Sequence, residues 1–540
     1  MSTLFTNGAL FDGQRYLGAG DVLVEAGRIV EVRSGGFEAR SARPPTTGVD
    51  VVDLDGGLLA PGFVDAHVHA VQGGLERTRC DLTEGQTRDD YLRVVEEYAD
   101  AHPDRPWILG GGWAMSAFPG GTPTAADLDS VVPDRPVFLP NRDHHGAWVN
   151  TRALELGGVR RDTPDPADGR FERDADGNPT GTLHEGAMHA VARLTPQTTD
   201  DEYYAALLEG QRHLHSYGVT GWQDAIVGAY AGMDDPGPTY LRAAREGDLS
   251  AHVVGALWWD RSRGEEQIAD LVERRDAYTH GQFRATSVKV MQDGVAENFT
   301  AALVEPYLDR CGHATTNTGH SFVDPAALRT YVRLLDAAGF QVHVHAIGDR
   351  GAREALDAFE GTDPERRHHI AHLQLVDPHD VRRFGELGVA ANLQMLWACL
   401  DEQMVDLTLP FLGPERSTWQ YPFGDLERAG ARLVAGSDWP VSTPNPLEAI
   451  HVAVNRREYG EAGHDRFLPE QAIALESAFA AYTSGSAWIN HRDHAGVLRP
   501  GASADLVVLD RDPFAGSADD IGGTRVVSTW VDGTAVHRQS

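Results

Sequence analysis

Short apolar segments rich in β-branched residues recur through the middle of the chain, and each is followed by a polar loop and a stretch with helical spacing. Stretches such as 201–218 and 325–339 carry apolar residues three and four positions apart, which is typical of amphipathic helices. Strands that alternate with helices in this way predict an α/β fold, the (β/α)8 TIM barrel. The eight predicted strands lie at residues 57–71, 218–225, 249–259, 285–294, 340–349, 367–376, 388–396 and 431–441.

Two regions fall outside this alternation. The gap between the first and second predicted strands is far longer than a crossover helix needs, so we expect an inserted lobe after strand 1 at about residues 75–200. Both chain ends read as short strands and turns, and each is too small to bury a core alone. We therefore predict one small β-sandwich built from residues 1–58 and 495–540, with the barrel domain at 59–494.

The charge of the chain limits its partners. The 540 residues include 47 Lys and Arg against 80 Asp and Glu, a formal net charge of −33. This charge repels phosphate backbones and anionic membranes, so we expect a small-molecule substrate, no nucleic acid and no membrane partner. The first residues lack a signal-peptide pattern and no long apolar run occurs, which predicts a cytoplasmic protein. We expect a homodimer, and we expect the three widely spaced cysteines to be reduced, buried packing residues.

Nearly all the basic residues are arginine, because Lys289 is the single lysine of the chain. A solvated surface charge tolerates replacement of lysine by arginine, so the remaining lysine can serve a role that arginine cannot. The alternative is that Lys289 persists by chance in a buried salt bridge with an acid such as Asp293.

Chemistry-bearing side chains stand at the ends of the predicted strands. TIM-barrel active sites lie at the carboxyl ends of the strands. His67 and His69 alternate at the end of the first strand, so both rings project to the same side and can share one metal ion. A lone His-x-His pair is weak evidence, but four more candidates stand at or near the ends of strands four, five, six and eight: Lys289, His345, His372 and Asp438.

The segments VDAHVHA, VKVMQDG, HAIGD, IAHLQ and AGSDWPV resemble the amidohydrolase superfamily. Nearly the whole chain resembles its amidohydrolase-3 group, which includes N-substituted formamide deformylases. The resemblance implies a metal-dependent hydrolase that cleaves an amide-type C–N bond with a metal-activated hydroxide. It implies two divalent ions per chain, with zinc as the default and manganese, iron or cobalt as alternatives.

The resemblance also implies a role for each strand-end residue. His67 and His69 would bind the more buried ion, and His345 would bind the second ion together with His372. A carboxylated Lys289 would bridge the two ions, because a neutral amine adds carbon dioxide to form a carbamate and an arginine does not. Asp438 would bind metal and move the proton. The catalytic candidates are Asp438, Lys289 and His372.

Other histidines compete for these roles: His343, His368, His369, His144 and His145. We choose His345 because it lies in HAIGD, and interpret His343 as a packing residue or a partner of the ligands. The chain departs from the family pattern at Ala371, where an acid is common, and in ANLQMLWACL, which lacks a histidine. A mononuclear deaminase and a non-catalytic barrel remain alternative functions.

The expected pocket residues are aromatic and polar side chains of the lobe and the barrel loops. Their aromatic share favours an apolar or aromatic N-substituent over a sugar or a phosphate. The scissile bond stays open between a formamide, another N-acyl amine, a carbamate and a cyclic amide. The substrate-binding candidates are Trp113, His145, Glu185, Asp293, Trp397 and Trp439, with Tyr421 beside them.

Overall fold

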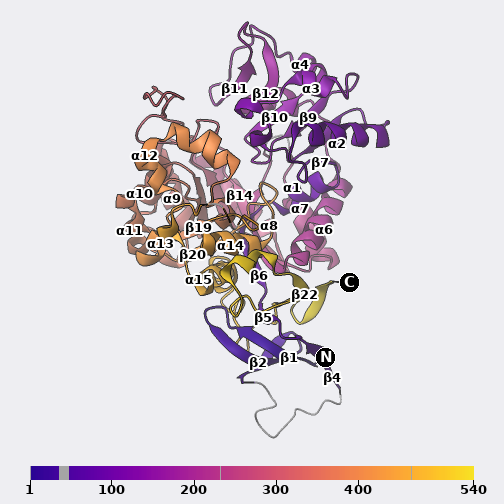
Figure 1. The fold of residues 1–540 in the computed structure, drawn as a ribbon, viewed down its shortest axis with the longest axis vertical. Helices are drawn as coiled ribbons and strands as arrows, with labels where there is room; N and C mark the ends of the chain where they lie inside the picture. The colour runs from indigo at the N-terminus through magenta and orange to yellow at the C-terminus, as the bar shows by residue number, and fades with distance from the viewer. Residues whose placement is uncertain (1, 36–47, 231–232, 462, 464, 540) are drawn as a thin grey trace.

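The centre of the protein is a parallel sheet curled into a barrel (Figure 1). The computed structural model describes residues 2–35, 48–230, 233–461, 463 and 465–539. In these residues eight parallel strands follow one another in chain order around the sheet, and the short β15 (Thr279–His280) pairs antiparallel with β16 outside this order. The predicted TIM barrel is confirmed. Its strands are β6 (Phe63–Val68), β13 (Val219–Val227), β14 (His252–Trp258), β16 (Phe283–Met291), β17 (Gln341–Ala346), β18 (His369–His372), β19 (Ala390–Leu393) and β20 (Leu433–Ala435).

Amphipathic helices cover the outside of the barrel. In α9, Asp324 caps the first turn through its side chain, Pro325 occupies the first helical position, and Leu328 and Val332 face the core. Helix α6 begins with a capping box built by Thr199. These local signals explain why both helices fall close to their predicted ranges. The outer helices are α6 (Asp200–Ser216), α7 (Gly237–Glu246), α8 (Ile268–Ala277), α9 (Pro325–Ala337), α10 (Asp349–Phe359), α11 (Pro378–Leu387), α13 (Phe423–Arg428) and α14 (Pro446–Asn455).

The first and last strands meet at a seam that closes the barrel. The backbone N–H of Asp438 donates to the carbonyl of His67 at 2.8 Å, and the N–H of His69 donates to the carbonyl of Trp439 at 2.8 Å. The buried carboxylate of Asp65 accepts from the N–H of Ser437 at 3.0 Å. The ends of β6 and β20 are thereby fixed side by side.

The inserted lobe stands beside the mouth of the barrel, at the upper right in Figure 1. It follows α1 (Ala70–Arg77) and contains a six-stranded sheet in the order β11-β12-β10-β9-β8-β7. Two apolar clusters of its own, one around Trp148 and one around Phe171, fill the two sides of this region. The strands are β7 (Cys80–Asp81), β8 (Ile108–Gly111), β9 (Val137–Pro140), β10 (Gly146–Val149), β11 (Gly169–Arg173) and β12 (Pro179–Glu185).

Strands of both chain ends share one eight-stranded sheet at the opposite end of the molecule (Figure 1). β5 joins them, because it pairs with β1 on one side and with β21 on the other. The sheet folds over a small core in which the rings of Phe5 and Trp530 lie 5.2 Å apart. Residues 36–47 of the predicted 1–58 segment lie outside the described residues. The strands are β1 (Ser2–Phe11), β2 (Tyr16–Glu25), β3 (Arg28–Ser34), β4 (Val49–Asp53), β5 (Leu58–Pro61), β21 (Leu506–Leu509), β22 (Val526–Val531) and β23 (Thr534–Arg538).

Two smaller expectations concern cysteines and hydropathy. Cys80 and Cys399 are buried free thiols, as predicted, but the prediction of burial is wrong for Cys311, which is exposed in the loop after β16. The backbone N–H of Cys311 donates to the Asp309 carboxylate at 2.8 Å in an exposed turn of that loop. Across the described residues, no helix combines the length and the apolar character needed to cross a bilayer.

The seam requires a glycine. A Cβ atom on Gly436 would lie 2.6 Å from the backbone nitrogen of His67. We expect Gly436→Ala to lower the free energy of unfolding by about 1–3 kcal/mol, the usual cost of overpacking, because β6 must move away from β20. Chemical denaturation measures this loss. Gly516→Ala is the matched control, since its nearest contact would be 3.8 Å away. Equal stability of the two variants would contradict the close seam.

Candidate metal centre

Three side chains from the seam converge at the carboxyl ends of the strands. The Nε2 atoms of His67 and His69 lie 3.2 Å and 3.0 Å from Oδ1 of Asp438. One ligand atom of each residue falls within 4.8 Å of the others. The alternation of the two histidines at the end of β6 places both rings on the barrel side, as the sequence pattern predicts.

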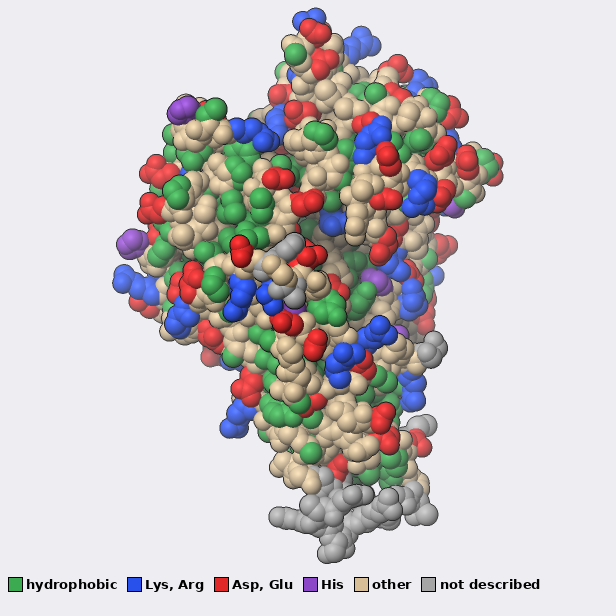
Figure 2. Space-filling model, viewed as in Figure 1, with side chains coloured by type: hydrophobic (Ala, Val, Ile, Leu, Met, Phe, Trp, Pro, Cys, Tyr) green, Lys and Arg blue, Asp and Glu red, His purple; other side chains and the backbone are tan. Residues whose placement is uncertain are grey.

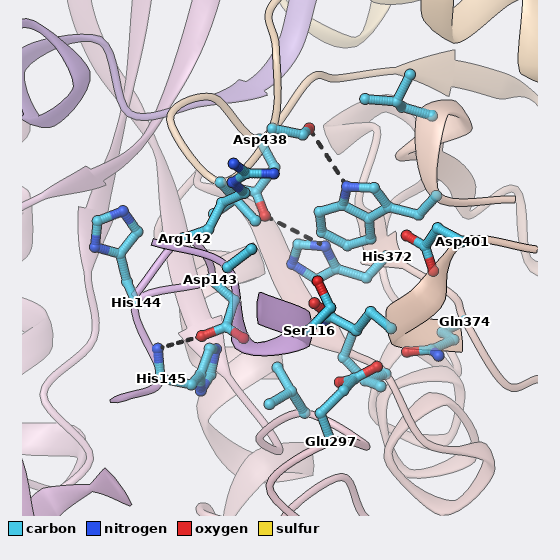
Figure 3. Close-up of a pocket in the computed structure, with 18 of the residues that line it drawn as sticks. Ser116, Arg142, Asp143, His144, His145, Glu297, His372, Gln374, Asp401 and Asp438 are labelled. Atoms are coloured by element: carbon cyan, nitrogen blue, oxygen red, sulfur yellow. Dashed lines mark hydrogen bonds and ion pairs between the residues drawn. The ribbon is translucent and has the colours of Figure 1, made fainter. Parts of the chain in front are cut away.

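A second group of side chains lies against the first. The rings of His345 and His372 are 4.4 Å apart, and Nδ1 of His372 lies 3.8 Å from Oδ2 of Asp438. A dashed line in Figure 3 marks this contact between His372 and Asp438. Nζ of Lys289 lies 3.3 Å from Nε2 of His67. The structure therefore brings all six predicted ligands together, with Asp438 and Lys289 in contact with residues of the β6 pair.

Burial sets the protonation of these groups. It lowers the pKa of His67 to about 3 and also lowers the pKa values of His345 and His372, so these rings are neutral and keep a lone pair. Burial also lowers the pKa of Lys289 to about 7, against the opposing effect of Asp438. Although burial alone would raise it, the neighbouring His67 holds the pKa of Asp438 well below its usual range. Near neutral pH the site thus offers lone pairs, a carboxylate and an available neutral amine.

Unpartnered polar atoms indicate that the site is built for a cation. Nδ1 of His372 and Oδ1 of Asp438 are buried and make no hydrogen bond among the described residues, although Nε2 of His67 and of His69 lie 3.2 Å and 3.0 Å from that oxygen. An unsatisfied buried polar atom costs about 1–3 kcal/mol, which a metal ion would remove by coordination. Imidazole nitrogen and carboxylate oxygen are ligands of zinc and of manganese, iron or cobalt. The residues present therefore fit a divalent cation.

Asp293 lies behind His345 and does not line the cavity. Its Oδ1 accepts from Nδ1 of His345 at 3.2 Å and from the N–H of Ile347, and its Oδ2 accepts from the N–H of Gly348 and of Ala302. This fully buried carboxylate orients the His345 ring and leaves Nε2 of that ring free. It pairs with His345 and not with Lys289, so the salt-bridge interpretation of the lysine has no support in the described contacts.

A cavity of about 910 Å³ opens above the six side chains, between the barrel loops and the lobe. His145, Trp397 and Tyr421 are among its lining residues, and the Trp397 ring stacks on His372 with an interplanar angle of 7°. Trp113 and Trp439 do not line this cavity. Trp113 donates from Nε1 to the carbonyl of Leu139 inside the lobe core, and Trp439 packs under α1.

The lobe contributes a hydrogen-bonded pair at the cavity wall. Nδ1 of His145 lies 3.0 Å from Oε1 of Glu185, which also accepts from the hydroxyl of Thr300. Although burial opposes it, the Glu185 carboxylate raises the pKa of His145 to about 9. Glu185 itself stands behind His145 and does not line the cavity. The lobe thus places one polar ring, supported from behind, beside the His345 ring at a centroid distance of 6.0 Å.

Several residues that line the cavity do not stand at the ends of predicted strands, because they lie on long loops. Arg142 and Asp143 come from the lobe, and Glu297 and Asp401 come from the loops after β16 and β19 (Figure 3). Burial raises the pKa of Asp401 to about 6. The only sequence signal for this group is the overall acidity of the chain, which Figure 2 shows as red side chains spread over this face. The position of a loop side chain depends on the tertiary fold, so its sequence gives no register.

Comparisons with known proteins find relatives over nearly the whole chain. The chain is 30% identical over 99% of its length to the protein LONG AFTER FAR-RED 3 of Arabidopsis thaliana, covering 91% of that protein. It is 26% identical over 95% of its length to an N-substituted formamide deformylase of Arthrobacter pascens, covering 94% of it. A solved structure of an uncharacterized metal-dependent hydrolase from Pyrococcus furiosus superimposes with a TM-score of 0.71 at 26% identity, over 95% of this chain and 100% of that one.

The family match spans the whole barrel and the inserted lobe, and in the composite terminal sheet it leaves out β1, β2 and β3. The profile described as the amidohydrolase family matches residues 50–537. This range contains the six side chains at the strand ends, the inserted lobe and the C-terminal strands. The chain is thus a member of the amidohydrolase family.

Proposed function

We propose that this protein is a binuclear metal-dependent hydrolase that cleaves an amide-type C–N bond of a small molecule. One observation carries the proposal: six ligand-type side chains from the ends of five strands converge beneath a cavity of about 910 Å³, and two of their buried ligand atoms, on His372 and Asp438, make no hydrogen bond among the described residues. Membership of the amidohydrolase family and the likeness to a metal-dependent hydrolase support hydrolysis. A non-catalytic barrel would have no need to keep unsatisfied ligand atoms buried.

The two histidine pairs would hold one ion each. His67 and His69 would hold the ion nearer the seam, and His345 and His372 would hold the ion nearer the lobe. Bound divalent ions, zinc by default, acidify water and polarise a carbonyl group. Asp438 contacts both pairs, so its carboxylate is placed to accept the proton of the attacking water and to pass it to the leaving nitrogen.

Lys289 would bridge the two pairs as a carbamate. Its neutral amine would add carbon dioxide, forming an N–C bond and releasing one proton, and the product would carry one negative charge shared by two oxygens. The contact of Nζ with His67 and the buried setting support this role, because an ammonium ion here would repel both cations. A mononuclear deaminase has no use for such a bridge.

The lining of the cavity favours a substrate with an apolar or aromatic N-substituent. Trp397 and Tyr421 line it together with Met291 and Leu396, which offer contact area to an apolar group. The relative from Arthrobacter pascens is described as an N-substituted formamide deformylase, so formamides are the first substrates to test. His145 would contact the part of the substrate nearest the lobe.

The first prediction concerns the metal content. We expect about two divalent ions per folded chain by elemental analysis, and loss of activity with a chelator. His67→Ala, His69→Ala, His345→Ala and His372→Ala should each lower kcat/KM by at least about 100-fold, more than the loss of a residue behind a ligand costs. His189→Ala, an exposed histidine of α5 (His189–Ala192), is the control. A fully active protein with one ion would favour the mononuclear deaminase.

The second prediction tests the bridge. Lys289→Arg should bind at most one ion and be inactive, because a guanidinium does not react with carbon dioxide. Lys289→Ala should be inactive but partly rescued by millimolar formate or acetate, which can occupy the bridging space. His67→Ala, treated with the same concentrations of formate or acetate, is the control and should not regain activity. A carbamate carbon signal after growth with ¹³C-bicarbonate gives direct evidence, and an active Lys289→Arg enzyme would refute the bridge.

The third prediction concerns the lobe. His145→Gln should leave the metal content unchanged and change kcat/KM by about 10-fold to 100-fold, since a hydrogen bond to a charged group is worth about 1.5–3 kcal/mol. The effect should differ between N-benzylformamide, its N-acetyl analogue and a cyclic imide. Glu185→Gln should reproduce a weaker form of this pattern. Unchanged kinetics of both variants on all three substrates would leave the lobe with a structural role only.

A further inference from the structure

A column of buried polar side chains runs down the inside of the barrel beneath His67. Nε2 of His343 lies 2.9 Å from Nδ1 of His67, and Nδ1 of His343 lies 2.8 Å from Oε1 of Gln223. The same Oε1 atom lies 3.1 Å from Nε2 of His369. All four side chains are fully or almost fully buried, so protein groups alone decide where their hydrogen atoms sit.

Backbone carbonyl groups fix the orientation of Gln223. Nε2 of Gln341 donates to the carbonyls of Arg367 at 2.9 Å and Ile489 at 2.7 Å, and a carbonyl can only accept. Oε1 of Gln341 therefore faces Gln223 and accepts from its Nε2 at 2.9 Å. Since Nε2 of Gln223 is the donor, its Oε1 must be the atom that faces the two histidines. The hydrogen bonds of Gln341 thus fix the orientation of the Gln223 amide, which places an acceptor oxygen at the centre of the barrel.

The acceptor determines the tautomers of the rings above it. Because Oε1 of Gln223 only accepts, the hydrogen of His343 sits on Nδ1. A neutral imidazole has one N–H, so Nε2 of His343 accepts, and the hydrogen of His67 sits on Nδ1. A second proton on His343 would make a buried cation with no carboxylate among its described partners. The Nε2 lone pair of His67 is then free and faces Lys289 and Asp438 at 3.3 Å and 3.2 Å.

His369 supports the same arrangement from the side. Its Nδ1 accepts from Nδ2 of Asn392 at 3.1 Å, and Nδ2 of Asn392 also donates to the carbonyl of Ala66 at 2.9 Å. The hydrogen of His369 therefore sits on Nε2 and points at Oε1 of Gln223. Two N–H groups converge on one amide oxygen, which opposes rotation of the Gln223 amide and holds His343 in place.

We propose that Gln223 and His343 are positioning residues that fix the tautomer of His67 and so prepare its Nε2 lone pair for a divalent cation before the metal arrives. This inference rests on the proposed role of His67 as a metal ligand. Partners behind a metal-ligating histidine commonly set its tautomer, and their loss costs about 10-fold to 100-fold in metal affinity. Lys289 and His343 are paired residues of β16 and β17, so His343 lies at the same level of the barrel as a candidate ligand.

The first arm of the test uses the metal-free wild-type chain. Long-range ¹H–¹⁵N correlation of ¹⁵N-histidine-labelled protein distinguishes Nδ1–H from Nε2–H rings, and the signals lost in His67→Gln identify His67. We expect an Nδ1–H ring. An Nε2–H ring at His67 in the wild-type chain would overturn the proposal. This measurement needs no catalytic activity, so it separates the proposal from the proposed hydrolysis.

The second arm measures cobalt(II) affinity by competition with a chromophoric chelator. His343→Phe keeps an aromatic ring but removes the acceptor, and we expect affinity for the first ion to fall about 10-fold to 100-fold. The control is His215→Phe, a buried histidine of α6 whose nitrogens lie 2.8 Å from the Val219 carbonyl and 2.8 Å from Oγ of Ser250; its affinity should stay unchanged.

A conservative variant covers the case in which His343→Phe does not fold. His343→Gln retains an amide oxygen that can accept from Nδ1 of His67, and we expect it to bind cobalt(II) more tightly than Gln223→Leu, which removes the fixed acceptor. Equal affinity of wild type and Gln223→Leu, or of wild type and His343→Phe, would overturn the proposal. Weakened affinity in a protein that hydrolyses none of the amides tested would support it and refute the proposed reaction.

Discussion

The seam between β6 and the residues after β20 is the constraint on which the site depends. Two backbone hydrogen bonds and the Asp65 carboxylate fix these segments against each other, and Gly436 allows the close approach. The seam brings the first strand of the barrel into contact with the last, although more than 360 residues separate them. Without this closure the Asp438 carboxylate would not reach the two histidines of β6.

The candidate cation site at the end of the closed barrel is supported by polar side chains in the barrel interior. The barrel holds the His343 and His369 rings in the space that aliphatic side chains commonly fill, and each ring has a partner on both nitrogens. Buried polar networks stabilise a fold only when their members are satisfied. The unsatisfied atoms of His69, His372 and Asp438 belong to side chains that line the cavity. This separation distinguishes the structural part of the network from the part that is free to bind.

The sequence predicts the barrel well because its signals are local. Eight strand-like segments and the capped helices α6 and α9 carry periodicity and end signals within each element. The convergence of strand-end residues also follows from topology, since parallel strands of a barrel end on one face. The candidate metal ligand on β17 is harder to identify. His343 and His345 are two positions apart and face the same side, so alternation alone does not separate them. Depth separates them, because His343 meets Gln223 inside the barrel while His345 reaches the cavity.

The positions of side chains outside the strands are the part of the site that the sequence does not predict. Trp113 and Trp439 were expected in the pocket because they are aromatic, but each satisfies a packing need elsewhere, in the lobe core and beneath α1. Asp293 follows a strand as a catalytic acid would, yet four hydrogen bonds turn it into the support of His345. The cavity is instead lined by loop residues such as Arg142 and Glu297, whose positions depend on how the lobe sits against the barrel. On the proposed function, the strand ends would determine the reaction class, and the lobe and loops, which vary most freely in a barrel, would determine the choice of substrate.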